Sequence, residues 1–153
     1  MTIDVDTILT DAELDEFLGG QVEGSTTLRP VSWENCAPAR QFALDEILRL
    51  LKRAGPTIEE EDITATATLK RAVCLGAASR LYELAMTSGN ASEVFFALEA
   101  RNRKLMNDEI RWIADEIQAA RVARLALVGV DLLTDEILEN KGRGRRSVVL
   151  VRR

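Results

Sequence analysis

The densest group of residues that could bind a metal or move a proton is a run of four carboxylates at residues 59–62, Glu-Glu-Glu-Asp. Adjacent carboxylates converge on one point only where the backbone folds around an ion. The run also comes just before a predicted helix, where acidic side chains interact favourably with the positive end of the helix dipole. We therefore interpret it as the solvated start of a helix, and we expect no metal site and no cofactor.

The sequence contains no histidine. The usual general base and the commonest ligand of transition metals are therefore missing. The chain also lacks the motifs of nucleophile elbows, phosphate loops, dinucleotide-binding folds and zinc proteases. These observations favour a protein that is not an enzyme, with a small helical enzyme using converging carboxylates as an alternative.

The two cysteines, Cys36 and Cys74, lie among small and apolar residues in predicted helical surroundings. Two cysteines can form at most one bridge. We expect both to be reduced side chains of the core rather than a disulfide or metal ligands.

Charge is distributed unevenly along a chain whose net charge is −5. Residues 1–23 carry seven carboxylates and no lysine or arginine, whereas residues 141–153 carry six cations and no acid. In a monomer the two ends would attract each other. In a self-assembling protein they would give neighbouring subunits complementary charge.

The composition is that of a soluble globular protein, with 46% apolar and 29% charged residues in a chain of 153. This length suits one domain with a substantial core. No apolar run is long enough to cross a bilayer, and the N-terminal residues are acidic where a signal peptide is basic. We expect synthesis in the cytoplasm and no membrane association.

Capping and stop signals predict the first two helices. Thr10 and Glu13 have the spacing of a capping box, so a short helix should start near residue 11 and end at Gly19-Gly20. Residues 21–35 show no periodicity and are predicted to be a loop, with Trp33 packed on the body. A second helix is predicted with Pro38 in its first turn and an apolar run over residues 39–54.

The central helix is predicted at residues 65–87, with Gly89-Asn90 as its stop. Its apolar residues recur at helical spacing and should form one buried face: Leu69, Ala72, Val73, Gly76, Ala77, Leu81, Leu84 and Ala85. Gly76 and Ala77 leave a notch in this face. We expect another helix to cross there with its backbone unusually close, and no ligand to bind.

A fourth and longest helix is predicted from Glu93, with Ser92 as its N-cap, to about residue 119. Asn102 lies on its apolar side and needs a structural hydrogen bond. Beyond residue 120 the periodicity weakens: residues 124–130 suit a helix or a strand, residues 134–139 a single helical turn, and residues 141–145 a basic connector. Residues 147–151 favour a strand, which would pair with its own chain or with another subunit.

The predicted fold class is mainly α, a four-helix bundle with one long C-terminal helix plus a short C-terminal strand or extended tail. Residues 1–120 form the predicted helical core and residues 121–153 a C-terminal arm.

Several segments resemble the head-to-tail adaptor (connector, or head-completion) proteins of tailed bacteriophages and gene transfer agents. The closest likeness is LKRAVCLGAASRLYELA, residues 69–85, which is similar to the core helix of that family. The segments DAELDEFLG, ARQFALDEILRLLKR and DITATATLKRAVCLGAASRLYELAM extend the resemblance over about residues 10–118. It covers helix lengths and core residues and includes no catalytic motif.

The resemblance implies a virion structural protein located in the particle neck. Such a protein forms a homo-oligomeric ring, generally of twelve subunits, beneath the portal, where it extends the DNA channel and contacts the next neck or stopper protein. In such rings the C-terminal segment commonly docks on the portal. The expected portal-docking residues are Arg143, Arg145, Arg146, Val148, Val149, Leu150, Val151, Arg152 and Arg153.

A different function class fits the basic tail. Arginine-rich segments bind phosphates with release of counterions, so a DNA-binding packaging accessory protein, similar to a small terminase subunit, is the alternative. The tail lacks interleaved aromatic residues, and no recognition helix is evident, so any such binding should be independent of DNA sequence.

Overall fold

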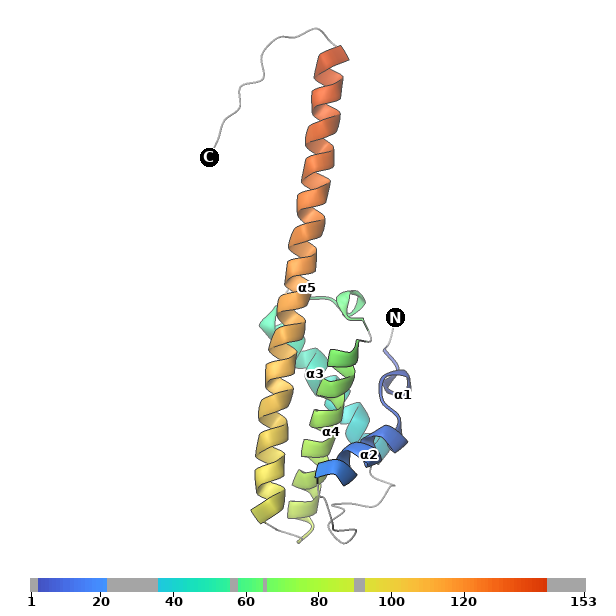
Figure 1. Ribbon diagram of the computed structural model, residues 1–153, viewed down its shortest axis with the longest axis vertical. Coiled ribbons are helices and arrows are strands. Elements are labelled where there is room, and N and C mark those ends of the chain that lie inside the picture. The colour runs from blue at the N-terminus through green and yellow to red at the C-terminus, as the bar shows by residue number, and fades with distance from the viewer. Residues whose placement is uncertain (1–2, 22–35, 56–57, 65, 90–92, 143–153) are drawn as a thin grey trace. The chain divides into compact units, whose positions relative to one another are not determined.

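The computed structural model describes residues 3–21, 36–55, 58–64, 66–89 and 93–142, and this part of the chain is mainly α-helical, as predicted (Figure 1). Its elements are α1 (Val5–Ile8), α2 (Asp11–Gln21), α3 (Cys36–Ala54), the 3₁₀ helix η3 (Glu60–Asp62), α4 (Ala67–Thr87) and α5 (Glu93–Gly142). The chain divides into two compact units, Met1–Gln118 and Ala119–Arg153. Helices α1 to α4 and the first half of α5 belong to the first unit.

The N-terminal segment contains one helix that was not predicted. Helix α1 is a single turn, in which the side chain of Asp4 accepts a hydrogen bond of 3.0 Å from the backbone N–H of Asp6. The capping box of α2 is confirmed. The Thr10 hydroxyl accepts from the N–H of Glu13 at 3.3 Å, and the Glu13 carboxylate accepts from the N–H of Thr10 at 3.0 Å.

The prediction that Gly19-Gly20 ends this helix was wrong, because α2 continues to Gln21. Among the described glycines, Gly89 alone has a positive φ, of 97°. Glycine is tolerated inside a helix at a modest cost in free energy, and it ends one only where the backbone turns to the left-handed region. Gly89 does so directly after α4, where a stop was predicted.

Helix α3 has Pro38 in its first turn and turns one face to the core. The buried residues of α3 are Cys36, Ala39, Arg40, Ala43, Leu44, Ile47 and Leu51. Arg40 is the one charged residue in this set. Lys52 and Arg53 lie in the last turn, where cations interact favourably with the negative end of the helix dipole.

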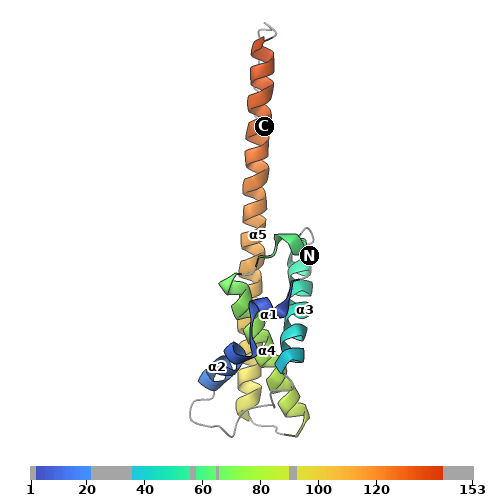
Figure 2. The same cartoon turned by 90° about the vertical axis from the view of Figure 1, so that its right-hand side faces the viewer.

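Helix α4 starts at the N-cap Thr66, whose hydroxyl accepts a hydrogen bond from the N–H of Leu69 at 3.2 Å. Helix α4 is more buried than predicted, because the prediction gave it only one buried face. Eight consecutive residues, 72–79, are buried, so this stretch is covered on all sides. Helices α1, α2 and α3 contact α4, and the first half of α5 runs alongside it (Figures 1 and 2).

Helix α5 is longer than predicted, because it continues to Gly142 rather than ending near residue 119. Residues 124–130 are helical, which excludes the strand alternative. The separate turn at residues 134–139 and the start of the connector at Lys141-Gly142 also belong to this helix. Alanine, leucine, arginine and glutamate have high helix propensity, so the helix persists where core periodicity is lost.

Candidate functional site

The expected portal-docking residues and the predicted strand at residues 147–151 lie within residues 143–153, outside the described part of the chain. Trp33, Asn90 and Ser92 also lie outside it.

The notch at Gly76 lies where α4 meets both α3 and α5. A Cβ atom built on Gly76 would lie 2.9 Å from Sδ of Met106, 3.0 Å from Cβ of Ala43 and 3.7 Å from Cα of Ala43. Gly76 and Ala77 are both buried. Two helices thus occupy the space that a side chain at position 76 would need.

A network of charged side chains lies at the surface beside this notch. Arg103 of α5 donates through Nε to Oε1 of Glu99 at 2.6 Å, and its Nη2 lies 4.0 Å from Oε2 of Glu83 on α4. Ser79 donates to the same Glu99 oxygen at 3.1 Å. The hydrogen bond that Arg103 donates to Glu99 raises the pKa of Arg103, so the guanidinium stays charged. The network ties α4 to α5.

Arg80 extends the network toward α3. Its Nη1 donates to Oε2 of Glu83 at 2.7 Å, and its guanidinium carbon lies 4.6 Å from the ring centre of Phe42, a cation–π contact. The small pocket enclosed here has a volume of about 10 Å³, room for one water molecule at most. Its lining consists of Phe42, Glu46, Gly76, Ser79, Arg80, Glu83, Arg103 and Met106. Such a pocket has no space for a substrate.

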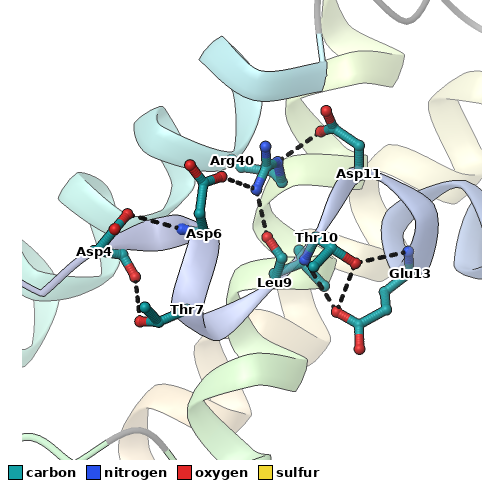
Figure 3. Close-up of polar contacts among 8 residues, drawn as sticks. All are labelled: Asp4, Asp6, Thr7, Leu9, Thr10, Asp11, Glu13 and Arg40. Carbon is teal, nitrogen blue, oxygen red and sulfur yellow. Dashed lines mark hydrogen bonds and ion pairs between the residues drawn. The ribbon is translucent and has the colours of Figure 1, made fainter.

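A second polar cluster, the Arg40 clamp, consists of Arg40, Asp6, Leu9 and Asp11 (Figure 3). Nη1 of Arg40 donates to Oδ1 of Asp6 at 2.8 Å and to the backbone carbonyl of Leu9. Nε lies 2.8 Å from Oδ1 of Asp11, close enough for an ion pair but not aligned as a hydrogen bond. The Arg40 side chain is only 5% exposed. The clamp therefore fastens α1 and the start of α2 to α3.

Sequence reasoning missed the Arg40 clamp, although a signal was present. Arg40 has the same helical spacing as the apolar residues on the buried face of α3. A buried guanidinium needs carboxylate or carbonyl partners, and the acidic N-terminal segment is the richest source of carboxylates in the chain.

Lys70 of α4 forms an ion pair with Glu13, the residue that closes the α2 capping box. The hydrogen bond from Lys70, followed by that from the backbone of Thr10, lowers the pKa of Glu13 from 4.5 to about 2. The same carboxylate therefore caps α2 and attaches this helix to α4.

Buried groups of the core have strongly shifted pKa values. Burial raises the pKa of the Cys74 thiol to about 12, so this thiol is not a ready nucleophile. Cys36 is also buried, as predicted for both cysteines. Burial likewise raises the pKa of Tyr82 to about 12, and its ring lies 5.5 Å from that of Phe95.

Large apolar side chains are exposed mainly on α5. These are Val94, Phe96, Trp112, Val122, Leu125, Leu127 and Val128, with Phe42 on α3.

The described residues include no group of three or more His, Cys, Asp or Glu side chains placed to hold a metal ion. None of their helices combines the length and apolar character of a membrane span.

Comparison with models of known protein families finds no match to this chain. A comparison with curated proteins also finds none. No solved structure matches the fold.

Proposed function

We propose that this chain is a structural adaptor of the neck of a phage or a phage-like particle. In this role it assembles as a ring, of twelve subunits, beneath the portal. The ring extends the DNA channel and presents a surface to the next neck or stopper protein. The protein is not an enzyme, and its partners are copies of itself, the portal and the next neck protein.

The observation that carries the proposal is the helix α4. The segment LKRAVCLGAASRLYELA, residues 69–85, resembles the core helix of head-to-tail adaptors, and here it falls entirely within α4. At Gly76 this helix packs closely against both α3, through Ala43, and α5, through Met106. A rigid body of this kind suits a part that is repeated around an axis.

The proposed attachment to the portal uses the segment 143–153. Its five arginines give it a positive charge, and its apolar run, Val148-Val149-Leu150-Val151, suits pairing with a strand or groove of another subunit. The described body carries paired charges in the Arg40 clamp and beside the notch. The tail, in contrast, carries arginines and no acidic residue.

The test mixes the purified full chain with purified portal rings of the same particle and measures assembly by native mass spectrometry and electron microscopy. We expect twelve copies to add to each portal ring. A chain truncated after Gly142 should keep its helical circular dichroism and lose binding. A matched control replaces the exposed body arginines Arg49, Arg53, Arg101 and Arg111 with alanine, and this control should still bind.

Failure of the full chain to bind portal rings under conditions where it is folded would reject this role. Equal binding by the truncated chain would instead show that residues 143–153 are not the docking segment. Loss of most of the helical signal on truncation would contradict the view that the tail is separate from the fold.

The second candidate, a DNA-binding packaging accessory protein, is favoured by the six cations and no acid of residues 141–153. A gel shift with duplex DNA over a range of salt concentrations separates the two functions. Binding through phosphates weakens steeply with salt, because each contact releases a counterion. Tight, salt-sensitive binding by the isolated chain would favour the DNA-binding function over the adaptor.

A further inference from the structure

The outer face of α3 carries a row of charged side chains. Asp45, Arg49 and Arg53 follow one another at intervals of four residues, and all three are exposed. Residues at this interval lie one above the other and form a ridge on the helix surface. We call this row the α3 ridge. Gln41 donates a hydrogen bond of 2.9 Å to Asp45, but neither arginine forms an ion pair within the described part of the chain.

A second ridge lies on the part of α5 that belongs to the first unit. It consists of Lys104, Asp108 and Trp112, again at intervals of four residues, and we call it the α5 ridge. Trp112 is 67% exposed, although proteins bury most of the surface of an average tryptophan. The exposed residues Asp115 and Glu116 follow one turn beyond it on the same side of the helix. Among the described residues, none of these four charged side chains has an ion-pair partner.

The chemistry of the α5 ridge favours an arginine as its partner. A guanidinium is planar, so it can stack on an aromatic ring while it donates hydrogen bonds to carboxylates nearby. The same chain contains a contact of this kind. The guanidinium carbon of Arg80 lies 4.6 Å from the ring centre of Phe42, and its Nη1 donates to Glu83. The α3 ridge presents two arginines that are one helical turn apart.

The two ridges are complementary residue by residue when their helices run in the same direction. The pairs, in chain order, are Asp45 with Lys104, Arg49 with Asp108, and Arg53 with Trp112 and the carboxylates beside it. Helices that pack such four-residue ridges against each other, with their axes crossing at about −50°, form the commonest class of helix packing. A surface of α3 thus fits a surface of α5 in both charge and spacing.

Other arrangements of the same two ridges lose this match. Opposite helix directions about the pair of Arg49 and Asp108 would set Arg53 beside Lys104, which has the same charge. A shift by one turn that brings Arg53 to Asp108 would set Asp45 beside Glu116. Like charges in contact disfavour an interface. The charges therefore select one direction and one register.

We infer that the α3 ridge of one copy binds the α5 ridge of a second copy of this chain. The contact joins two different surfaces, and contacts of this type build rings when the rotation between copies closes. The inference goes beyond the proposed role in a particle neck and does not rest on it, since it requires only this chain. Attachment to the portal is proposed for residues 143–153, so a variant that has lost the ridge contact should still bind portal rings.

The first test measures the mass of the full chain by sedimentation velocity over a series of protein and salt concentrations. We expect association that grows with protein concentration. It should weaken as salt is added, because the ridges are exposed and their charges are screened. A monomer at every protein concentration at low salt would overturn the inference.

The second test reverses the charges of one ridge at a time. Asp45→Lys/Arg49→Glu changes the α3 ridge and Lys104→Glu/Asp108→Lys the α5 ridge, and both variants keep the net charge. Each should weaken association about tenfold, because two ion pairs become repulsive. An equal mixture of the two variants, or one chain with all four substitutions, should associate like the parent, because opposite charges face each other again.

The matched control is Glu61→Lys/Arg124→Glu, which also keeps the net charge. Both residues are exposed and lie outside the two ridges, so association should be unchanged. Circular dichroism confirms that each variant remains helical. A mixture that stays monomeric would refute the pairing of the ridges. Loss of association in the α5 variant but not in the α3 variant would also overturn it, because the α5 ridge would then bind another basic segment, such as residues 143–153.

Discussion

Gly76 allows a direct measurement of how tightly α4 is packed. Glycine-to-alanine substitution inside a helix gains up to about 1 kcal/mol from helix propensity. At Gly76 the added Cβ would lie 2.9 Å from Sδ of Met106 and 3.0 Å from Cβ of Ala43. The thioether of Met106 can move, but Cβ of Ala43 is fixed to the backbone of α3.

Overpacking of a core typically costs about 1–3 kcal/mol, which outweighs the gain in propensity. We therefore expect Gly76→Ala to lower the free energy of unfolding by about 1 kcal/mol, and Gly76→Leu by about 3 kcal/mol. For a chain of this size each kcal/mol corresponds to about 2–4 °C in Tm. The leucine variant should therefore melt about 6–12 °C below the parent chain.

The matched control is Gly19→Ala in α2. A Cβ at Gly19 meets nothing within 4 Å, so this substitution gains propensity without a clash and should raise the stability. A double-mutant cycle with Ala43→Gly then isolates the contact, because that change removes the Cβ that meets residue 76. Gly76→Ala should be tolerated better in the Ala43→Gly background. An unchanged Tm for Gly76→Leu would refute the close helix crossing.

Three further predictions concern the polar and titratable groups. Arg40→Met should lower the denaturant midpoint less than replacing both carboxylate partners of Arg40 with asparagine, because the latter leaves a buried charge without a counter-charge; the opposite order would contradict this reasoning. Tyr82 is the only tyrosine, so absorbance at alkaline pH should show it ionising near pH 12 in the folded chain. Since its pKa is raised, its contribution to stability is complete below pH 10 and is lost as the pH rises toward 12, whereas ionisation of the folded chain near pH 10 would exclude its burial. Glu13 has a lowered pKa, so its contribution is present above pH 4.5 and is lost as the pH falls toward 2. Lys70→Ala should flatten the decline of Tm over this acid range, and an unaltered decline would count against the ion pair.

Local signals in the sequence were sufficient to predict where several helices start or end. The Thr10–Glu13 capping box, Pro38 and the stop at Gly89 depend on residues close in the chain, and each has its predicted place. The same kind of signal misled at Gly19-Gly20, because a glycine inside a helix and a glycine that ends one differ in backbone angle rather than in residue type. The length of α5 was also missed, since a helix without a packed face carries no apolar periodicity.

The polar contacts were less predictable because they join residues far apart in the chain. Arg40 contacts Asp6 across 34 positions, and Lys70 contacts Glu13 across 57. Helical spacing identifies Arg40 as a residue on the buried face but does not say which of several acidic residues meets it. The notch was easier to locate, because the loss of bulk at Gly76 is a feature of residue size within one helix.

The continuous burial of residues 72–79 has a consequence for how this chain can vary in sequence. A helix with one wet side accepts polar residues every third or fourth position, so its tolerance to substitution rises and falls with the helical repeat. For eight residues α4 has no such side. A survey of all single substitutions should therefore find that α3 tolerates substitutions in a periodic pattern, whereas residues 72–79 of α4 tolerate few at any position. Residues 72–79 should then change more slowly in sequence than the rest of the chain.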